Sequence, residues 1–338
     1  MNYALSIPAT IIAGYLGAGK TSLVNHLLRT ANGLRIAVLV NDFGDINIDA
    51  DLIESHNGDV IALAGGCVCY SFGSDLMAGL QKLTQLPLPP QHVLIEISGV
   101  ALPSTVASSL RLTRDVQLQA IVVLVDAETI VAKIADRFVG DTVLAQLQAA
   151  HLLVLNKTDL IDADTMAALT DRLAAINPRA TCVSAQRGVV PNELVLGWGD
   201  AWRSSGDTSV TPIEGGDERT VAQRRPLSRY RQSLRKRSAH DSSSPLDVLT
   251  TVSVRFCATI DAELLAASLA DPALGAYRAK VLGRRPDGTA IAIQVVGSRF
   301  DICCSSHRFP EHGRLICIGR GSAFNAVAIE RLLAEASR

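Results

Sequence analysis

The sequence predicts an α/β protein in which a mostly parallel sheet covered by helices is followed by a smaller α+β domain. Three observations lead to this fold class. The chain has 338 residues, more than one typical domain, and 48% of them are hydrophobic, enough for two cores. Near-continuous apolar runs alternate with helical stretches up to about residue 190, as in a sheet buried on both faces. The composition then changes before an apolar pattern resumes.

Five apolar runs are the expected strands of the first domain, and polar residues close several of them. In a parallel sheet the carboxyl ends of the strands lie at one edge, where ligands bind. The residues that close these runs are therefore expected to surround a ligand. The runs are residues 8–13, 35–40, 92–96, 120–126 and 151–156.

The expected domains are a first domain at 1–200, a flexible basic linker at 201–245 and a second domain at 246–338. The linker is rich in Ser, Gly and Arg, with a basic cluster at 224–237. A solvated connection between domains is favoured over a surface for nucleic acid or anionic lipid. In the second domain, strands are expected at 248–255, 290–296 and 314–319, and helices at 262–269 and 323–336.

Residues 14–21 read G-Y-L-G-A-G-K-T, between the first apolar run and a helical stretch. This strand–loop–helix context is the one a phosphate-binding P-loop requires. Lys20 is expected to neutralise the β- and γ-phosphates as a catalytic residue, and the Thr21 hydroxyl to bind Mg²⁺. The alternative is a glycine-rich turn without a ligand. The residues expected to bind the nucleotide here are Gly14, Gly17, Ala18, Gly19, Lys20, Thr21 and Ser22.

The run N-K-T-D at 156–159 predicts that the nucleotide is GTP rather than ATP. Guanine presents two adjacent donors that the carboxylate of Asp159 can accept together, whereas adenine would leave it unpaired. Asn156 is expected to brace the neighbouring loops, and the stem of Lys157 to lie over the base. Residues 181–185 are the expected next loop on the base side.

Glu96 closes a predicted strand and is followed by Ser98 and Gly99. A carboxylate at this point can hold a Mg²⁺-bound water or orient the attacking water, and the Gly99 N–H can contact the γ-phosphate. Glu96 is therefore expected to be catalytic and to serve the magnesium site together with Thr21. For Asp126, which also ends a strand, structural and functional roles remain equally open.

Cys67 and Cys69 form a C-x-C pair after two glycines. Two thiolates at this spacing can hold one borderline metal ion, with Zn²⁺ and Co²⁺ the candidates. A complete site needs further ligands, and Asp42 and Asp45 are the expected ones. The alternative is a pair of buried thiols. The seven scattered cysteines indicate a reducing cytoplasm.

Together these motifs resemble the CobW family of P-loop GTPases, also called the CobW/nitrile hydratase activator family, which includes zinc-transferring metallochaperones. The resemblance implies that GTP hydrolysis is coupled to binding of a metal ion and its delivery to a client metalloprotein. One position differs, since the usual C-x-C-C has Tyr70 at its last residue. Weaker binding, recruitment of aspartate or water, and loss of metal binding are the open alternatives. The matching segments are 14–21, 41–45, 66–69, 96–99 and 156–159, with more diffuse matches at 277–280 and 314–320.

The leading hypothesis is therefore a slow GTPase that uses Mg²⁺ and carries zinc or cobalt. The alternative is a metal-independent GTPase switch that acts as an assembly or regulatory factor. A small-molecule kinase is disfavoured because such kinases usually use ATP. The balance of 32 basic against 33 acidic residues gives no reason to expect a membrane or nucleic-acid partner. The apolar start is read as a first strand rather than a signal peptide. A nucleotide-dependent homodimer is expected only by analogy with related GTPases.

Overall fold

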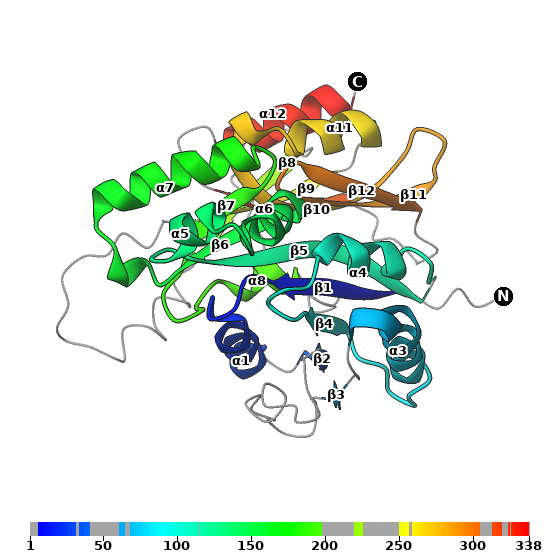
Figure 1. Cartoon of the computed structure of the whole chain (residues 1–338). Coiled ribbons are helices and arrows are strands. Elements are labelled where there is room, and N and C mark those ends of the chain that lie inside the picture. The colour runs from blue at the N-terminus through cyan, green and yellow to red at the C-terminus, as the bar shows by residue number, and fades with distance from the viewer. Residues whose placement is uncertain are drawn as a thin grey trace. The chain divides into compact units, whose positions relative to one another are not determined.

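The computed structural model divides the chain into two compact units, residues 1–200 and 201–338. Figure 1 shows the whole chain. The first unit ends where the composition of the sequence changes. The structure describes residues 6–31, 34–40, 61–64, 68–113, 115–197, 220–225, 250–256, 259–304, 313–319, 324 and 326–337.

The first unit contains a seven-stranded sheet in the order β3-β2-β4-β1-β5-β6-β7. Every neighbouring pair in it is parallel, which confirms the predicted α/β class. The short strand β3 was not expected, and β5 begins four residues before the run that predicted it. The strands are β1 (Ile7–Ala13), β2 (Ile36–Val40), β3 (Ile61–Ala64), β4 (His92–Glu96), β5 (Val116–Asp126), β6 (Leu152–Asn156) and β7 (Thr181–Ser184).

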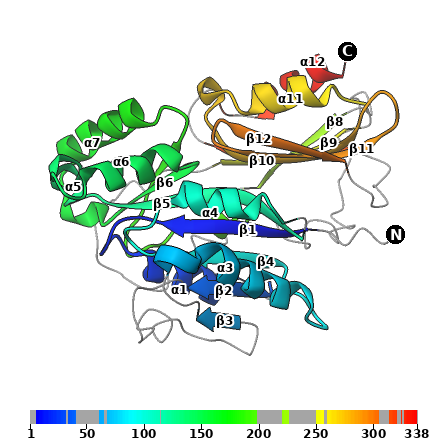
Figure 2. The same ribbon diagram turned by 45° about the vertical axis from the view of Figure 1, so that its right-hand side comes forward.

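Helices cover both faces of this sheet, and the alternation of side chains along β1 separates the two layers. Ile11 and Ala13 pack in one core with residues of α3, α4, α6 and α7. Thr10, which points to the other face, donates to the carbonyl of Val195 in α8 (2.9 Å). Figure 2 shows α3, α4 and α6 along the first face. The helices are α1 (Lys20–Thr30), α3 (Val68–Thr84), α4 (Pro103–Leu110), α5 (Ile130–Ala135), α6 (Gly140–Ala149), α7 (Ala163–Ile176), α8 (Asn192–Leu196) and the 3₁₀ turn η1 (Thr158–Leu160).

The second unit is a six-stranded antiparallel sheet in the order β12-β11-β10-β13-β9-β8, with two helices packed on one face. This is the smaller α+β domain that the sequence predicts. One strand, β8, lies within the segment expected to be a flexible linker and pairs with β9. The elements are β8 (Thr220–Arg225), β9 (Thr250–Phe256), α11 (Ala262–Leu269), η2 (Pro272–Leu274), β10 (Ala276–Arg284), β11 (Ala290–Val296), β12 (Arg299–Cys304), β13 (Gly313–Gly319) and α12 (Ala326–Ala336).

Among the described helices, none combines the length and the apolar character that crossing a membrane would require.

Candidate functional site

The P-loop strand β1 lies at the centre of the first sheet, with β4, β2 and β3 on one flank and β5, β6 and β7 on the other. Because all seven strands are parallel, the segments that follow them leave from the same edge. Glu96 ends β4 on one flank, and Asn156 ends β6 on the other. The predicted phosphate-side and base-side residues therefore lie on opposite sides of the P-loop.

The P-loop is a tight connection that ends at Lys20, the first residue of α1. Two of its glycines are needed because neighbouring strands fill the space where a side chain would lie. Gly14 (φ 134°) has the Leu124 carbonyl oxygen of β5 in the place of a Cβ, and Gly19 (φ 101°) has the amide nitrogen of Asn156. The buried Lys20 Nζ donates to the carbonyl of Gly14 (3.1 Å), so the ammonium lies against the loop.

Thr21 and Glu96 meet beside the P-loop. The hydroxyl of Thr21 donates to Glu96 Oε1 (3.1 Å), and Glu96 is only 2% exposed. This contact follows from the sheet, in which Glu96 pairs with Ile12 of β1. The other carboxylate oxygen, Oε2, is buried and accepts no hydrogen bond from the described residues. The structure thus brings together the two residues predicted for magnesium.

The donor chemistry of this pair fits Mg²⁺. Magnesium prefers oxygen ligands and usually takes one or two protein oxygens together with substrate phosphates and waters. A hydroxyl and a carboxylate in direct contact at the start of α1 provide such oxygens next to the loop that would hold the phosphates.

His26, on the buried side of α1, anchors the helix that begins with Lys20. Its Nε2 donates to the carbonyl of Val190 (2.9 Å). Burial lowers the pKa of His26 more than this hydrogen bond raises it, and Arg29 lowers it further. The neutral imidazole is therefore the favoured form in the folded protein.

The loop after β4, residues 97–102, is held between the P-loop and α6. A Cβ at Gly99 would lie 2.7 Å from the backbone nitrogen of Leu16, so the two loops are in direct contact. The buried amide of Gln146 donates to the carbonyls of Gly99 (3.0 Å) and Ala101 (2.9 Å). Sequence reasoning missed Gln146. Its signal was a polar residue on a helix face that also carries the buried Val143 and Leu147.

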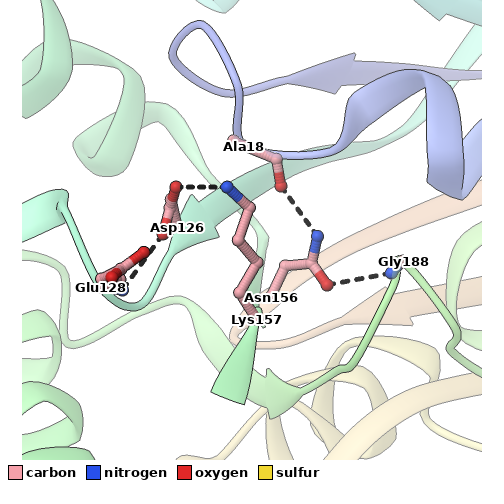
Figure 3. A network of polar contacts seen from close by, with 6 residues as sticks. All are labelled: Ala18, Asp126, Glu128, Asn156, Lys157 and Gly188. Atoms are coloured by element: carbon pink, nitrogen blue, oxygen red, sulfur yellow. Dashed lines mark hydrogen bonds and ion pairs between the residues drawn. The ribbon is translucent and has the colours of Figure 1, made fainter. Parts of the chain in front are cut away.

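On the base side, Asn156 connects the P-loop to the loop after β7. Its amide nitrogen donates to the carbonyl of Ala18 (2.9 Å), and its amide oxygen accepts from the N–H of Gly188 (2.9 Å). Figure 3 shows these two bonds on opposite sides of one side chain. Asn156 is 2% exposed. It braces the two loops, as its sequence motif led us to expect.

Lys157 follows in a left-handed conformation (φ 62°) and forms an ion pair with Asp126. Its Nζ lies 2.7 Å from Asp126 Oδ2, and Asp126 Oδ1 accepts from the N–H of Glu128 (3.1 Å) (Figure 3). Both carboxylate oxygens therefore have partners. The structure thus places Asp126, whose role the sequence left open, in contact with a predicted base-site residue.

Asp159 lies exposed in η1, one residue beyond Thr158, which anchors this turn. The N–H and hydroxyl of Thr158 both donate to the carbonyl of Ala185 (3.3 and 3.1 Å). Ala185 directly follows β7, and residues 181–184 of the segment expected to form the next base-side loop are that strand. The exposed carboxylate is accessible to a ligand at this edge.

The expected cargo-metal ligands Asp42, Asp45 and Cys67 lie outside the described residues. Cys69 is the second residue of α3, in the first turn of a helix. Within the described part of the chain, no group of three or more His, Cys, Asp or Glu side chains could hold a metal ion. The cargo-metal site therefore stays a prediction.

The family model "CobW/HypB/UreG, nucleotide-binding domain" matches residues 8–184, more than half of the chain. This chain belongs to the CobW/HypB/UreG family. The matched range includes β1 to β7 apart from the first residue of β1, and so contains both flanks of the site.

Named relatives of this CobW/HypB/UreG chain include proteins of bacteria and a yeast. It is 34% identical over 222 residues to "Zinc chaperone CobW" of Sinorhizobium sp, covering 57% of this chain and 63% of that one. It is 32% identical over 192 residues to "Zinc-regulated GTPase metalloprotein activator 1" of Schizosaccharomyces pombe, covering 54% and 46%. It is 31% identical over 200 residues to "Zinc chaperone YjiA" of Escherichia coli, covering 56% and 61%. The chain thus spans less than two thirds of the length of each of these curated relatives.

Among solved structures, the Zn(II)-bound YjiA GTPase of Escherichia coli aligns with 99% of this chain and 100% of its own, with a TM-score of 0.41 and 20% identity. The hydrogenase maturation factor HypB of Archaeoglobus fulgidus aligns with 53% and 81%, with a TM-score of 0.36 and 20% identity. Scores and identities this low support no functional conclusion.

Proposed function

We propose that this chain binds GTP with Mg²⁺ and hydrolyses it slowly to GDP and phosphate. The observation that carries the proposal is the placement of the P-loop between the Thr21–Glu96 pair on one side and the Asn156–Lys157 network on the other. A nucleoside triphosphate needs this order of partners: metal and phosphate ligands at one end, a base site at the other.

In the proposed site, the backbone N–H groups of the P-loop and Lys20 hold the phosphates, and Thr21 and Glu96 hold Mg²⁺, which offsets the phosphate charge when bound. Glu96 also positions the attacking water, and the N–H of Gly99 contacts the γ-phosphate. The exposed Asp159 accepts the two donors of guanine, and Lys157 lies over the base. The remaining contacts are assigned to Gly14, Gly17, Ala18, Gly19, Ser22 and Asn156.

Nucleotide choice is tested by titrating the protein with fluorescent GTP and ATP analogues. Asp159→Asn keeps the size of the side chain and removes the charge, so GTP affinity should fall roughly tenfold or more while ATP affinity stays unchanged. Asp164→Asn, at the start of α7, is the matched control. Equal affinity of the unmodified protein for GTP and ATP would refute the guanine assignment.

We further propose that GTP hydrolysis is coupled to a metal cargo held by Cys67 and Cys69 with help from Asp42 and Asp45. The sheet order supports this coupling, because the segments with these residues follow β2 and β3, the two strands beyond β4. Neighbouring strands are about 4.8 Å apart, so β3 lies about 14 Å from β1.

Zinc and cobalt are the proposed cargoes, and two of the relatives above are named zinc chaperones. Delivery would go to a client metalloprotein in a reducing cytoplasm. A nucleotide-dependent homodimer is also proposed, and light scattering with GDP and with a GTP analogue tests it.

The cargo proposal is tested by equilibrium dialysis of Zn²⁺ and Co²⁺ against the protein in its GDP and GTP-analogue states. Cys67→Ala together with Cys69→Ala should abolish stoichiometric binding, whereas the same change at Cys303 and Cys304 should leave it intact. Undiminished metal binding by the first double variant would show that the site is elsewhere.

Tyr70 favours one second candidate, a GTPase switch without metal cargo that acts as an assembly or regulatory factor. Tyr70 stands where the family motif has its third cysteine. Because a phenol is a poor zinc ligand at neutral pH, it does not replace that thiolate. If the unmodified protein binds GTP but no metal, and Tyr70→Cys creates metal binding, this candidate replaces the metallochaperone.

A further inference from the structure

The 97–102 loop begins directly after Glu96 and carries Ser98 and Gly99, so its position determines where the Gly99 N–H lies. The loop turns tightly, with the N–H of Ala101 donating to the carbonyl of Ser98 (3.0 Å). It starts from the sheet, where the N–H of Ile97 donates to the carbonyl of Ile12 in β1 (3.0 Å). Its first residue is thus fixed by the sheet, and the turn after it needs a second anchor.

Gln146 of α6 provides that anchor. Its amide nitrogen donates to the carbonyls of Gly99 and Ala101, which flank Val100 at the tip of the turn. The side chain is 1% exposed, so water cannot readily replace these bonds. The orientation of the amide follows from its partners, because an amide oxygen facing two carbonyl oxygens would be repelled by both.

The helix that carries Gln146 is itself fixed. Val143 and Leu147 pack in the main core of the unit. The amide nitrogen of Asn177 closes the end of α6 by donating to the carbonyls of Leu147 (2.7 Å), Gln148 (3.2 Å) and Ala150 (3.1 Å). Because α6 is held in place, the two hydrogen bonds from Gln146 fix the loop relative to this helix.

The space on the other side of the loop is filled by the P-loop. A Cβ at Gly99 would lie 2.6 Å from the side chain of Leu16, in addition to its close approach to the backbone nitrogen of the same residue. A Gly99 loop that moves outward must break the two bonds from Gln146, and one that moves inward meets Leu16.

We propose that Gln146 is a positioning residue that holds the 97–102 loop against the P-loop, so that the Gly99 N–H is in place for the γ-phosphate. The inference rests on the proposed GTPase function and deepens it. In this role Gln146 acts through the carbonyls of Gly99 and Ala101 rather than by contact with nucleotide or Mg²⁺. Its effect should therefore depend on the third phosphate and be absent for GDP.

The test compares Gln146→Leu, which removes both donors at similar volume, with Gln146→Glu, which places acceptors against the two carbonyls. Gln148→Leu, at an exposed position of the same helix, is the matched control. We expect affinity for a GTP analogue and kcat to fall roughly tenfold, the factor that about two net hydrogen bonds provide. GDP affinity should change less than about twofold. An unchanged ratio of GTP-analogue to GDP affinity in both variants would overturn the proposal.

Hydrogen exchange of the ligand-free protein tests the anchor itself, independently of nucleotide. Amides of the 97–102 loop should exchange faster in Gln146→Leu than in the unmodified protein and the control, while the amides of β1 and β6 stay protected. Unchanged exchange in the loop would refute the anchoring role even if the protein is a GTPase. Conversely, an unmodified protein that binds no GTP would refute the proposed function. The exchange result would still show whether Gln146 anchors the 97–102 loop.

Discussion

Replacing Asn156 tests whether the P-loop and the base side form one unit. Asn156→Ala removes a buried side chain with two hydrogen bonds and leaves the Ala18 carbonyl and the Gly188 N–H without that partner. Each buried group left unsatisfied costs about 1–3 kcal/mol, so the expected loss of stability is about 2–6 kcal/mol. Water entering the gap brings the value toward the lower half of this range.

Thermal unfolding of the nucleotide-free protein measures this loss. For a unit of this size, about 1 kcal/mol shifts Tm by about 2–4 °C, so a decrease of about 5–15 °C is expected. Asn156→Asp keeps an acceptor for Gly188 but faces the Ala18 carbonyl with an oxygen, so it should also weaken guanine-nucleotide binding. Gln148→Ala, at an exposed helical position, serves as the control for the substitution itself. The bracing role is refuted if the Tm of Asn156→Ala lies within 1–2 °C of that of the unmodified protein, a shift of less than about 1 kcal/mol, and the variant binds GDP normally.

Three further predictions concern other parts of the chain. Asp126→Asn removes the ion pair with Lys157, so affinity for GDP and GTP should fall equally, by about two- to fivefold, and a change in their ratio would contradict a base-side role. Because burial lowers the pKa of His26 below its usual 6.5, the unfolded state binds more protons as the pH falls through that region. Stability should therefore decrease on acidification, and urea titrations at several pH values should show a smaller decrease for His26→Gln. A thiol reagent followed by mass spectrometry should modify the exposed Cys304 in the folded protein and spare Cys317, whose thiol pKa is raised by burial.

The strands that carry the site could be predicted because each is marked by an apolar run of a few consecutive residues. The run 92–96 has three consecutive apolar residues between His92 and Glu96, and β4 has the same bounds. The Thr21–Glu96 contact also followed, since a P-loop and an acid at the end of a neighbouring parallel strand must meet at one edge.

What the sequence could not predict depends on contacts between distant residues. The anchoring of Gly99 by Gln146 joins residues 47 positions apart, so the polar position on the buried face of α6 did not reveal its partner. The pairing of Lys157 with Asp126 depends on the register of β5 with β6. Strand β8 was missed because its six residues lie in a basic stretch and form a strand only by pairing with β9.

The position of β3 affects how the proposed metal cargo would be released. This four-residue strand is the last in the sheet and pairs only with β2 among the described strands, whereas β1 is bonded on both sides. Opening the end of a sheet breaks few hydrogen bonds and exposes little core, so it requires much less free energy than opening its centre. In the metallochaperone proposed above, the cysteine pair that follows β3 would thus exchange its ion with another protein by local opening, while the nucleotide stays bound at β1.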